Sequence, residues 1–422
     1  MIAGIPFNAW AVWGIAATAT AGVILRPFGW PEFVWAACGA AALVVLGLLP
    51  AADALAGIAR GTDVYLFLIG MMLLAELARL EGLFAWLAAH AARRARGSAG
   101  RLFTLIFAVG TIVTVFLSND ATAVVLTPAV AAAAQAARVP DKLPYLFICA
   151  FIANAASFVL PISNPANLVI YGAHMPALLQ WLPHYALPSA LSIGATYLML
   201  RLTQRRHLRG AICVDIAVPR LSRGGAASAL GIVGTAGVLM GCSAFGAQLG
   251  LPTFIAGLAT LLLVWARSGS GAWRVAQGVA WGVLPLVAGL FVLVQALQDT
   301  GLVARLGVLL AEAIRHSAVW SGWGAGMVLG FGCNLINNLP AGLLAGRVVA
   351  LAHAPEAVRG AVVIGIDLGP NLSVTGSLAT ILWLGALRRE GVNVSFWAFL
   401  RVGVVVMPLA LLAALGGRAV LF

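Results

Sequence analysis

The chain has 422 residues, of which 62% are hydrophobic and 9% are charged, and its formal net charge is +12. A soluble core of this size needs a charged surface, so this composition excludes a soluble globular protein. Apolar runs of about 16 to 22 residues recur along the chain, close to the length that spans a bilayer. We therefore predict a multi-pass membrane protein.

The positive charge lies in short segments between these apolar runs. Such segments are typical of cytoplasmic loops at the lipid headgroups, so we expect no nucleic acid partner. The longest of them, 201–223, contains six arginines and lies at the midpoint of the chain. It divides the chain into a first membrane repeat over 1–200, a basic cytoplasmic linker over 201–223 and a second membrane repeat over 224–422.

The first half contains one long apolar excursion, 102–137, which is interrupted at Ser118-Asn119-Asp120 and basic at both ends. By the positive-inside tendency both ends face the cytoplasm, so this excursion enters the membrane and returns. The polar triplet then lies at its tip, and the length leaves open whether the hairpin crosses fully. An amphipathic stretch at 82–96 is a candidate interfacial helix. The spans predicted in this half are 9–26, 33–49, 63–80, 143–172 and 185–200.

The second half repeats this order of elements. Its interrupted excursion is 318–352, and the stretch 300–316 is again amphipathic. An odd number of crossings in each half makes the second half enter the membrane in the opposite sense. We predict an all-α integral membrane protein with about 10 transmembrane helices and two helical hairpins, arranged as two inverted-topology repeats with broken helices. The spans predicted here are 225–243, 249–266, 276–297, 358–387 and 396–416.

Polar side chains gather where the spans should break. Pro161 and Pro165 interrupt 143–172, and Gly369-Pro370 and Gly376 interrupt 358–387. Freed backbone groups must line protein or a water-filled cavity, where nearby amides and hydroxyls can hold a small polar solute. The alternative is that these side chains only bridge helices. The candidate substrate-binding residues are Asn119, Asn154, Ser157, Ser163, Asn164, Asn337, Asn338, Asn371, Thr375 and Ser377.

Asp120 and Asp367 are the only carboxylates placed centrally in these polar segments. Because burial disfavours the charged form, both are candidate proton carriers, which makes the proton gradient the energy source without a cofactor. Cys149 and Cys333 each precede a polar cluster, and thiolates bind soft ions, so a direct ligand role stands beside ordinary buried packing. No histidine or cysteine spacing predicts a metal site.

At these clusters the chain resembles the ArsB family of arsenite and antimonite efflux permeases, within the ion transporter superfamily. The resemblance rests on Ser118-Asn119-Asp120, on 154–164, on Asn337-Asn338-Leu339-Pro340 and above all on 365–380. It implies a carrier of the plasma membrane, the bacterial inner membrane, that exports arsenite or antimonite against proton entry. It also implies that a soluble arsenical-pump ATPase can couple to some members, here at the 201–223 loop.

The local chemistry suits this resemblance, because trihydroxy arsenite is neutral and needs hydrogen-bonding groups rather than a counter-charge. Dicarboxylate carriers of the superfamily carry a Ser-Asn-Thr triplet in each half, whereas the corresponding residues here are Ser163-Asn164-Pro165 and Thr375-Gly376-Ser377. A sodium/proton antiporter remains the alternative, since Asp120, Asp367 and freed carbonyls can coordinate sodium. An integral-membrane enzyme and a non-transporting receptor are both disfavoured, because the chain lacks a nucleotide-binding loop, a zinc or intramembrane-protease signature and a sizeable soluble domain.

Overall fold

The computed structural model describes residues 7–172, 175–269 and 271–422, so residues 1–6 of the predicted first repeat lie outside it. In the described chain every named element is helical, and one isolated β-bridge joins Ser98 to Ala211. The first half contains α1 (Phe7–Leu25), α2 (Glu32–Val45), α3 (Ala51–Ala59), α4 (Thr62–Leu80), α5 (Leu83–Arg94), α6 (Ala99–Phe116), α7 (Thr127–Ala136), α8 (Leu143–Ala155), α9 (Pro165–Tyr171) and α10 (Leu178–Gln204).

After a linker over 205–222, the second half contains helices in a similar order of lengths. They are α11 (Arg223–Ala244), α12 (Gly250–Ser268), α13 (Ala272–Gly278), α14 (Val283–Asp299), α15 (Leu302–His316), α16 (Ala318–Ile336), α17 (Asn338–Leu351), α18 (Glu356–Leu368), α19 (Leu378–Arg389) and α20 (Phe396–Ala419).

The prediction of an all-α membrane protein is confirmed. Within the described residues α1, α6, α11, α12 and α20 are each long and apolar enough to span a bilayer, and α13 and α14 reach that length only as a bent pair. Large apolar side chains on these helices face outward, among them Val233 and Leu262 at 69% and 60% exposure. Such surfaces are stable in lipid and costly in water.

Three predicted spans end elsewhere in the structure. The predicted span 276–297 is not one straight helix, because residues 279–282 separate α13 from α14 and the two helices bend by 46°. Pro285 then lies in the first turn of α14, where a helix tolerates proline. The predicted span 33–49 stops early, since α2 ends at Val45 and Gly47 turns the chain with a φ of 67°. The predicted span 185–200 is part of a longer helix, α10, which extends beyond it at both ends.

The excursion 102–137 returns to the side from which it starts, as predicted. The linker holds both of its ends through adjacent residues: the Ile212 N–H donates to the Gly97 carbonyl, and the Cys213 N–H donates to the Ala137 carbonyl, both at 2.9 Å. Between these ends the chain forms α6, the polar tip, a π-helical turn (Ala121–Leu126) and α7. The second hairpin is formed by α16 and α17.

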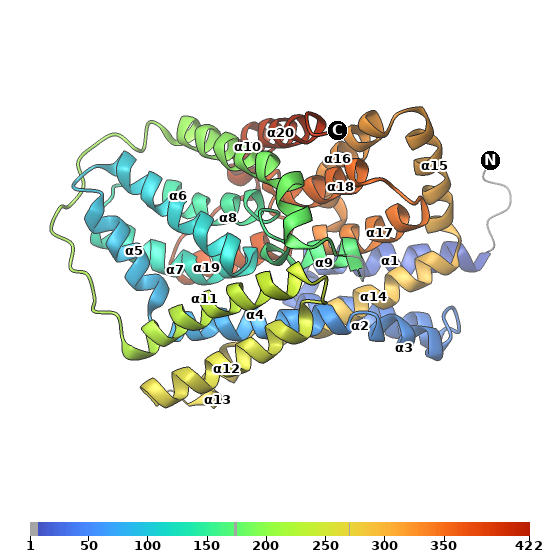
Figure 1. Ribbon diagram of the computed structural model, residues 1–422, viewed down its shortest axis with the longest axis horizontal. Helices are drawn as coiled ribbons and strands as arrows, with labels where there is room; N and C mark the ends of the chain where they lie inside the picture. Colours follow the sequence, from blue (N-terminus) through green and yellow to red (C-terminus); the bar gives the residue numbers. More distant parts are fainter. Residues whose placement is uncertain (1–6, 173–174, 270) are drawn as a thin grey trace.

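Both polar-centred spans are broken in the middle, as predicted. In each half the second helix begins 22 residues after the first, at Leu143 and Pro165 in one half and at Glu356 and Leu378 in the other. Figure 1 shows α8 to the left of α9 but α18 to the right of α19, so the two broken spans run in opposite directions. It also shows the first hairpin at the left end of the molecule and the second at the right end.

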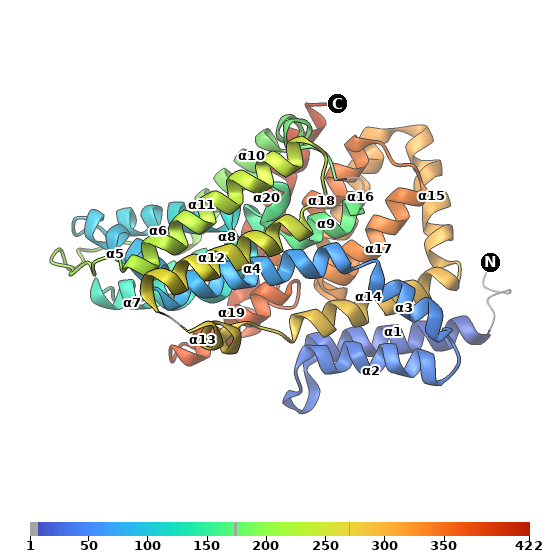
Figure 2. The same cartoon turned by 60° about the horizontal axis from the view of Figure 1, so that its bottom comes forward.

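Close helix crossings hold these pieces together. Gly322, Gly326 and Gly330 of α16 lie against α18, where an added Cβ would meet the backbone or small side chains of Ala357, Ala361 and Gly365. Small residues at this four-residue spacing let the two helices approach closely. Around this core, α1 and α2 pack with α14, and α11 and α12 pack with α4. Figure 2 shows these as two separate helix groups.

Candidate functional site

One pocket lies where the four interrupted elements meet. Asn119 and Asp120 come from the tip of the first hairpin, and Asn338 comes from the tip of the second. Asn164 and Ser377 come from the two breaks. The pocket encloses about 380 Å³ between its lining atoms, part of it open to solvent. Its remaining lining is Leu68, Pro165, Val283, Val287, Leu339, Leu378 and Ala379.

The helix ends orient the polar side chains of this pocket. Asn164 is the N-cap of α9, where its Oδ1 accepts a hydrogen bond from the Ala166 N–H at 3.0 Å. Ser377 is the N-cap of α19 and accepts from the Thr380 N–H at 3.1 Å. Each cap satisfies a backbone donor that lipid could not, and the first turns of both helices point their positive ends toward the pocket.

Asp120 supplies the only charged side chain in the pocket lining. Within the described residues its carboxylate forms no hydrogen bond or ion pair, although its backbone N–H donates to Asn119 Oδ1 at 2.9 Å. Asn119 is buried, whereas Asp120 is partly exposed. The tip of the first hairpin therefore presents a free carboxylate to the pocket.

Asp367 lies behind the pocket wall, fully buried at the end of α18. Its Oδ1 accepts a hydrogen bond from Asn164 Nδ2 at 2.8 Å, which joins the two halves of the chain. Its Oδ2 has no hydrogen-bond partner among the described residues. Buried polar atoms are rarely left unpaired, so this oxygen is an available site for a proton or for a hydrogen-bond donor.

A second amide pair joins the same two breaks. Asn154 Nδ2 donates to Asn371 Oδ1 at 3.0 Å, and Asn371 Nδ2 donates to the Phe151 carbonyl at 2.9 Å. The Ser157 hydroxyl donates to the Asn154 carbonyl at 2.8 Å, at the point where α8 ends. These three predicted residues are buried and lie outside the pocket lining, so here they connect helix ends.

Each break also binds the hairpin of its own half. In the first half the Ser163 hydroxyl donates to the Val115 carbonyl at 3.0 Å, near the end of α6. In the second half the Asn338 N–H donates to the Gly376 carbonyl at 2.8 Å. Asn337 takes a φ of 69° in the turn between α16 and α17 and caps α17. The Thr375 hydroxyl donates to the Asn334 carbonyl at 2.9 Å.

Asn334 is a residue that sequence reasoning missed. Its Nδ2 donates to the Gly369 carbonyl at 3.0 Å, and its Oδ1 accepts from the Ser373 hydroxyl at 2.8 Å. It thus ties α16 to the second break. Its position in the last turn of α16, just before the Asn337-Asn338 tip, is the sequence signal that could have indicated it. The apolar wall from α4 and α14 carried no such signal.

The two candidate thiols lie away from the pocket lining. Cys149 and Cys333 are both buried, and the Cys333 thiol donates to the Gly330 carbonyl at 3.5 Å. In the described part of the chain no three histidine, cysteine, aspartate or glutamate side chains gather where they could hold a metal ion.

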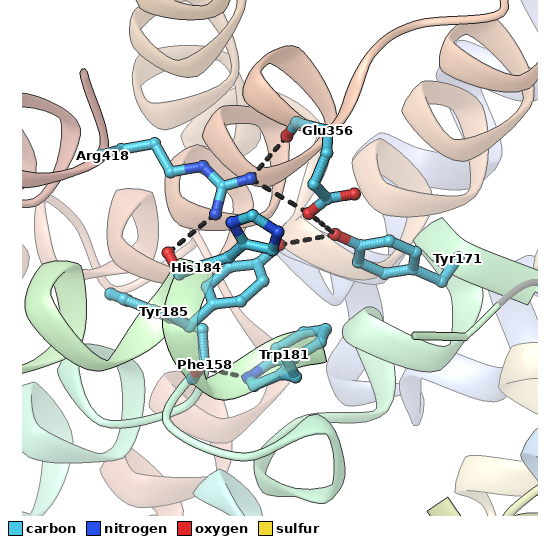
Figure 3. Close-up of polar contacts among 7 residues, drawn as sticks. All are labelled: Phe158, Tyr171, Trp181, His184, Tyr185, Glu356 and Arg418. Atoms are coloured by element: carbon cyan, nitrogen blue, oxygen red, sulfur yellow. Dashed lines mark hydrogen bonds and ion pairs between the residues drawn. The ribbon is translucent and has the colours of Figure 1, made fainter. Parts of the chain in front are cut away.

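A buried ionic network, also missed, joins the outer ends of the same helices (Figure 3). Arg418 of α20 is 2% exposed and donates to Glu356 Oε1 at 3.0 Å. Tyr171, the last residue of α9, donates to the same oxygen at 2.6 Å. Arg418 also donates to the His184 carbonyl at 2.7 Å, which Pro188 cannot bond in α10 because it lacks an N–H. The helices α9 and α18 are thus linked at both ends.

The chain is similar to several known membrane proteins. A family model described as a citrate transporter matches residues 14–367. The arsenical pump membrane protein of Yersinia enterocolitica is 28% identical over 363 residues, covering 83% of this chain and 84% of that protein. Its namesake in Escherichia coli K12 is 28% identical over 366 residues, with the same coverage. An uncharacterized transporter of Mycobacterium tuberculosis is 28% identical over 397 residues, covering 89% of this chain and 90% of that protein.

The fold has a counterpart among solved structures. The YdaH transporter of Alcanivorax borkumensis superimposes with a TM-score of 0.57 and 17% identity, covering 99% of this chain and 97% of that one. The predicted resemblance to ArsB permeases is confirmed by the curated relatives. Because the family model spans most of the chain, this protein belongs to the citrate transporter family of multi-pass membrane transporters.

Proposed function

We propose that this transporter exports arsenite, and antimonite, from the cytoplasm in exchange for protons. The observation that carries the proposal is the composition of the central pocket. Its polar lining consists of amides, a hydroxyl and one carboxylate, and no arginine, lysine or histidine lines it. Neutral arsenite has three hydroxyl groups, each able to donate to an amide or carboxylate oxygen and to accept from an amide N–H.

The two aspartates supply the proposed coupling. The unpaired carboxylate of Asp120 would release its proton when an arsenite hydroxyl needs an acceptor, and would take one up when the site empties. Asp367 would act as the second proton carrier, from behind the pocket, through its unpaired Oδ2. A carrier of this kind needs only the proton gradient, and we propose no cofactor. Both roles rest on a shared principle: an ionisable group at membrane depth is expensive and is kept for a function.

The repeat arrangement supports alternating access. Opposite directions of the two broken spans and their equal 22-residue spacing fit two inverted-topology repeats, as expected of secondary transporters. We place the protein in the bacterial inner membrane, with the 205–222 linker in the cytoplasm. That linker would also be the docking segment for a soluble arsenical-pump ATPase in cells that have one.

Two other substrates are less well supported. Citrate, named in the family description, is a tricarboxylate, and its charges would meet Asp120 with no lining cation to balance them. Sodium exchange for protons remains the alternative through Asp120 and freed carbonyls, but the arsenical pump relatives do not favour it.

Everted membrane vesicles provide the test, because their lumen corresponds to the outside of the cell. An acid-inside gradient should drive arsenite into vesicles that contain the protein, and collapsing the gradient should stop it. Parallel assays replace arsenite with citrate, or add sodium while lumenal pH is followed. Gradient-driven citrate uptake, or proton release on sodium addition without arsenite transport, would contradict the proposal and identify the other substrate.

A further inference from the structure

A second pocket lies at the start of α6, whereas the tip residues Asn119 and Asp120 follow the end of that helix. It encloses about 820 Å³ of space between its lining atoms, much of it open. Three arginines from three helices converge there: Arg94 from the last turn of α5, Arg101 from α6 and Arg201 from α10. The rest of its lining is Ser98, Gly100, Thr104 and Leu105, so no acidic residue faces the guanidinium groups.

One of these arginines is held in place by the fold. Arg201 Nη1 donates to the Tyr197 hydroxyl at 2.7 Å and to the Thr104 hydroxyl at 3.0 Å, and its guanidinium lies 5.8 Å from the Tyr197 ring centre. A contact to the Gly100 carbonyl, at 3.5 Å, extends this set along α6. Because Nη1 alone makes these contacts, the Nη2 and Nε donors of this guanidinium are left for a ligand.

The other two arginines have no side-chain partners among the described residues. Arg94 and Arg101 are exposed, and neither side chain forms a hydrogen bond or ion pair with a described residue. Ser98 caps α6 by accepting from the Arg101 N–H at 3.3 Å, so the positive end of the helix dipole adds to the same field. Three arginines around one pocket favour an anionic ligand. A phosphate suits them because guanidinium groups bind its oxygens through paired hydrogen bonds.

The helices that carry these arginines continue as apolar faces. Thr104 bonds to Tyr197 while Gly100 bonds to Arg201, so α6 and α10 run antiparallel with their basic ends together. Along the exposed side of α6, Arg101 is followed by Leu105, Ala108, Ile112 and Phe116, and Ile112 is 58% exposed. Along α10, Arg201 is preceded by exposed Leu198, Leu191 and Leu187.

We propose that this pocket is a binding site for an anionic phospholipid, with its phosphate on Arg94, Arg101 and Arg201 and its acyl chains along α6 and α10. The apolar faces distinguish this ligand from a soluble phosphate, which has nothing to place on them. The basic segments on both sides predict that this end of α6 faces the cytoplasm, where basic clusters bind anionic headgroups. The site is independent of the transported substrate.

The test compares lipid binding by the full-length chain with that of a double variant, R94Q/R101Q. Since neither side chain has an internal partner, this variant should fold. Native mass spectrometry in detergent would follow titrations with phosphatidylglycerol and with phosphatidylcholine. Each basic residue near an anionic headgroup strengthens binding about fivefold, so the double variant should bind phosphatidylglycerol roughly 25-fold more weakly. Phosphatidylcholine binding should stay weak in both proteins.

The control is R305Q/R389Q, which removes the same charge from two exposed arginines outside the pocket. It should retain phosphatidylglycerol binding. Equal affinity in R94Q/R101Q and the unchanged protein would overturn the proposal, as would equal losses in both double variants, because binding would then follow net charge alone. A third titration uses inorganic phosphate: displacement of the lipid by phosphate at comparable concentration would overturn the lipid assignment in favour of a soluble ligand.

Discussion

Asn164 and Asp367 stand 203 positions apart in the chain, yet the amide of the first donates to the carboxylate of the second at 2.8 Å. The bond joins the N-cap of α9 to the end of α18, so the break in the first half is held directly against the break in the second. Both residues were selected from the sequence as separate members of two polar clusters. Their pairing makes the two breaks one unit.

The first prediction concerns this pair. Asp367→Asn should reduce acid-driven arsenite uptake in everted vesicles to the background of vesicles without the protein, because an amide cannot carry the proton. The swap N164D/D367N returns one carboxylate and one amide to the same junction and should restore part of the uptake. Both variants should elute from size-exclusion chromatography like the unchanged protein. Full uptake in Asp367→Asn would remove the proposed proton role.

Asp120→Asn separates coupling from substrate binding. The change removes the only charge from the pocket lining but leaves an amide of the same size, so net acid-driven uptake should be lost. Exchange of labelled for unlabelled arsenite needs no net proton movement and should persist. Asp141→Asn is the control, since that carboxylate lies on the surface 3.0 Å from His207. Loss of exchange together with net uptake would mean that substrate binding itself requires the charged carboxylate, and would leave its separate role in proton coupling unsupported.

Glu356→Gln tests the buried ionic network of Figure 3. It leaves the Arg418 guanidinium buried without a counter-charge, which costs about 3–5 kcal/mol. Glu312→Gln breaks an exposed pair with Arg315, whose atoms are 3.7 Å apart, and should cost about 0–1 kcal/mol. Thermal unfolding in one detergent compares the two variants. Similar shifts in midpoint would mean that the Arg418 pair contributes no more than a surface one.

Asn334→Ala tests the residue that links α16 to the second break. It removes a donor to the Gly369 carbonyl and an acceptor for Ser373. The buried groups left without a partner should lower the free energy of unfolding by about 1–3 kcal/mol. Arsenite uptake should fall with it, because the hairpin tip loses its anchor. Asn334→Asp keeps the acceptor but loses the donor, so its arsenite uptake should be intermediate. Uptake by Asn393→Ala, which changes an exposed asparagine, should equal that of the unchanged protein. Identical uptake in all three would contradict an anchoring role.

The double variant C149A/C333A tests whether a thiolate binds the substrate. Neither thiol lines the pocket, so half-saturation of arsenite uptake should stay unchanged, with about 1 kcal/mol of stability lost at each site through lost packing. The measurement is the concentration dependence of uptake at a fixed gradient. A large rise in half-saturation concentration, with folding intact, would show that a cysteine is a ligand.

Local features of the site were predictable from the sequence because they depend on local chemistry. Pro161 and Pro165 stand four residues apart and each removes a backbone donor, so together they favour a break in their span, and Asn164 and Ser377 are good N-caps for the helices that follow. The equal order of elements in the two halves identified both hairpins. The general membrane fold followed from composition and periodicity.

Long-range pairings were not predictable, because no local pattern encodes them. Nothing near Asn154 indicates its bond to Asn371, 217 positions later. No local pattern around Arg418 distinguishes it from an exposed arginine near a helix end, yet it is buried against Glu356 and the His184 carbonyl. The bend between α13 and α14 was missed because the apolar run through it is nearly continuous. Tertiary packing decides each of these features.

The two backbone bonds at the base of the first hairpin have a mechanical consequence. Ile212 and Cys213 are neighbours in the chain, so one short stretch of the linker is bonded to both ends of the hairpin formed by α6 and α7. A displacement of this stretch of the linker would therefore move Gly97 and Ala137 together. The helices α6 and α7 would transmit that movement to Asp120 at the tip. A subunit that binds this part of the linker would thereby act on Asp120, the carboxylate at the tip of the hairpin, without contacting the transmembrane helices.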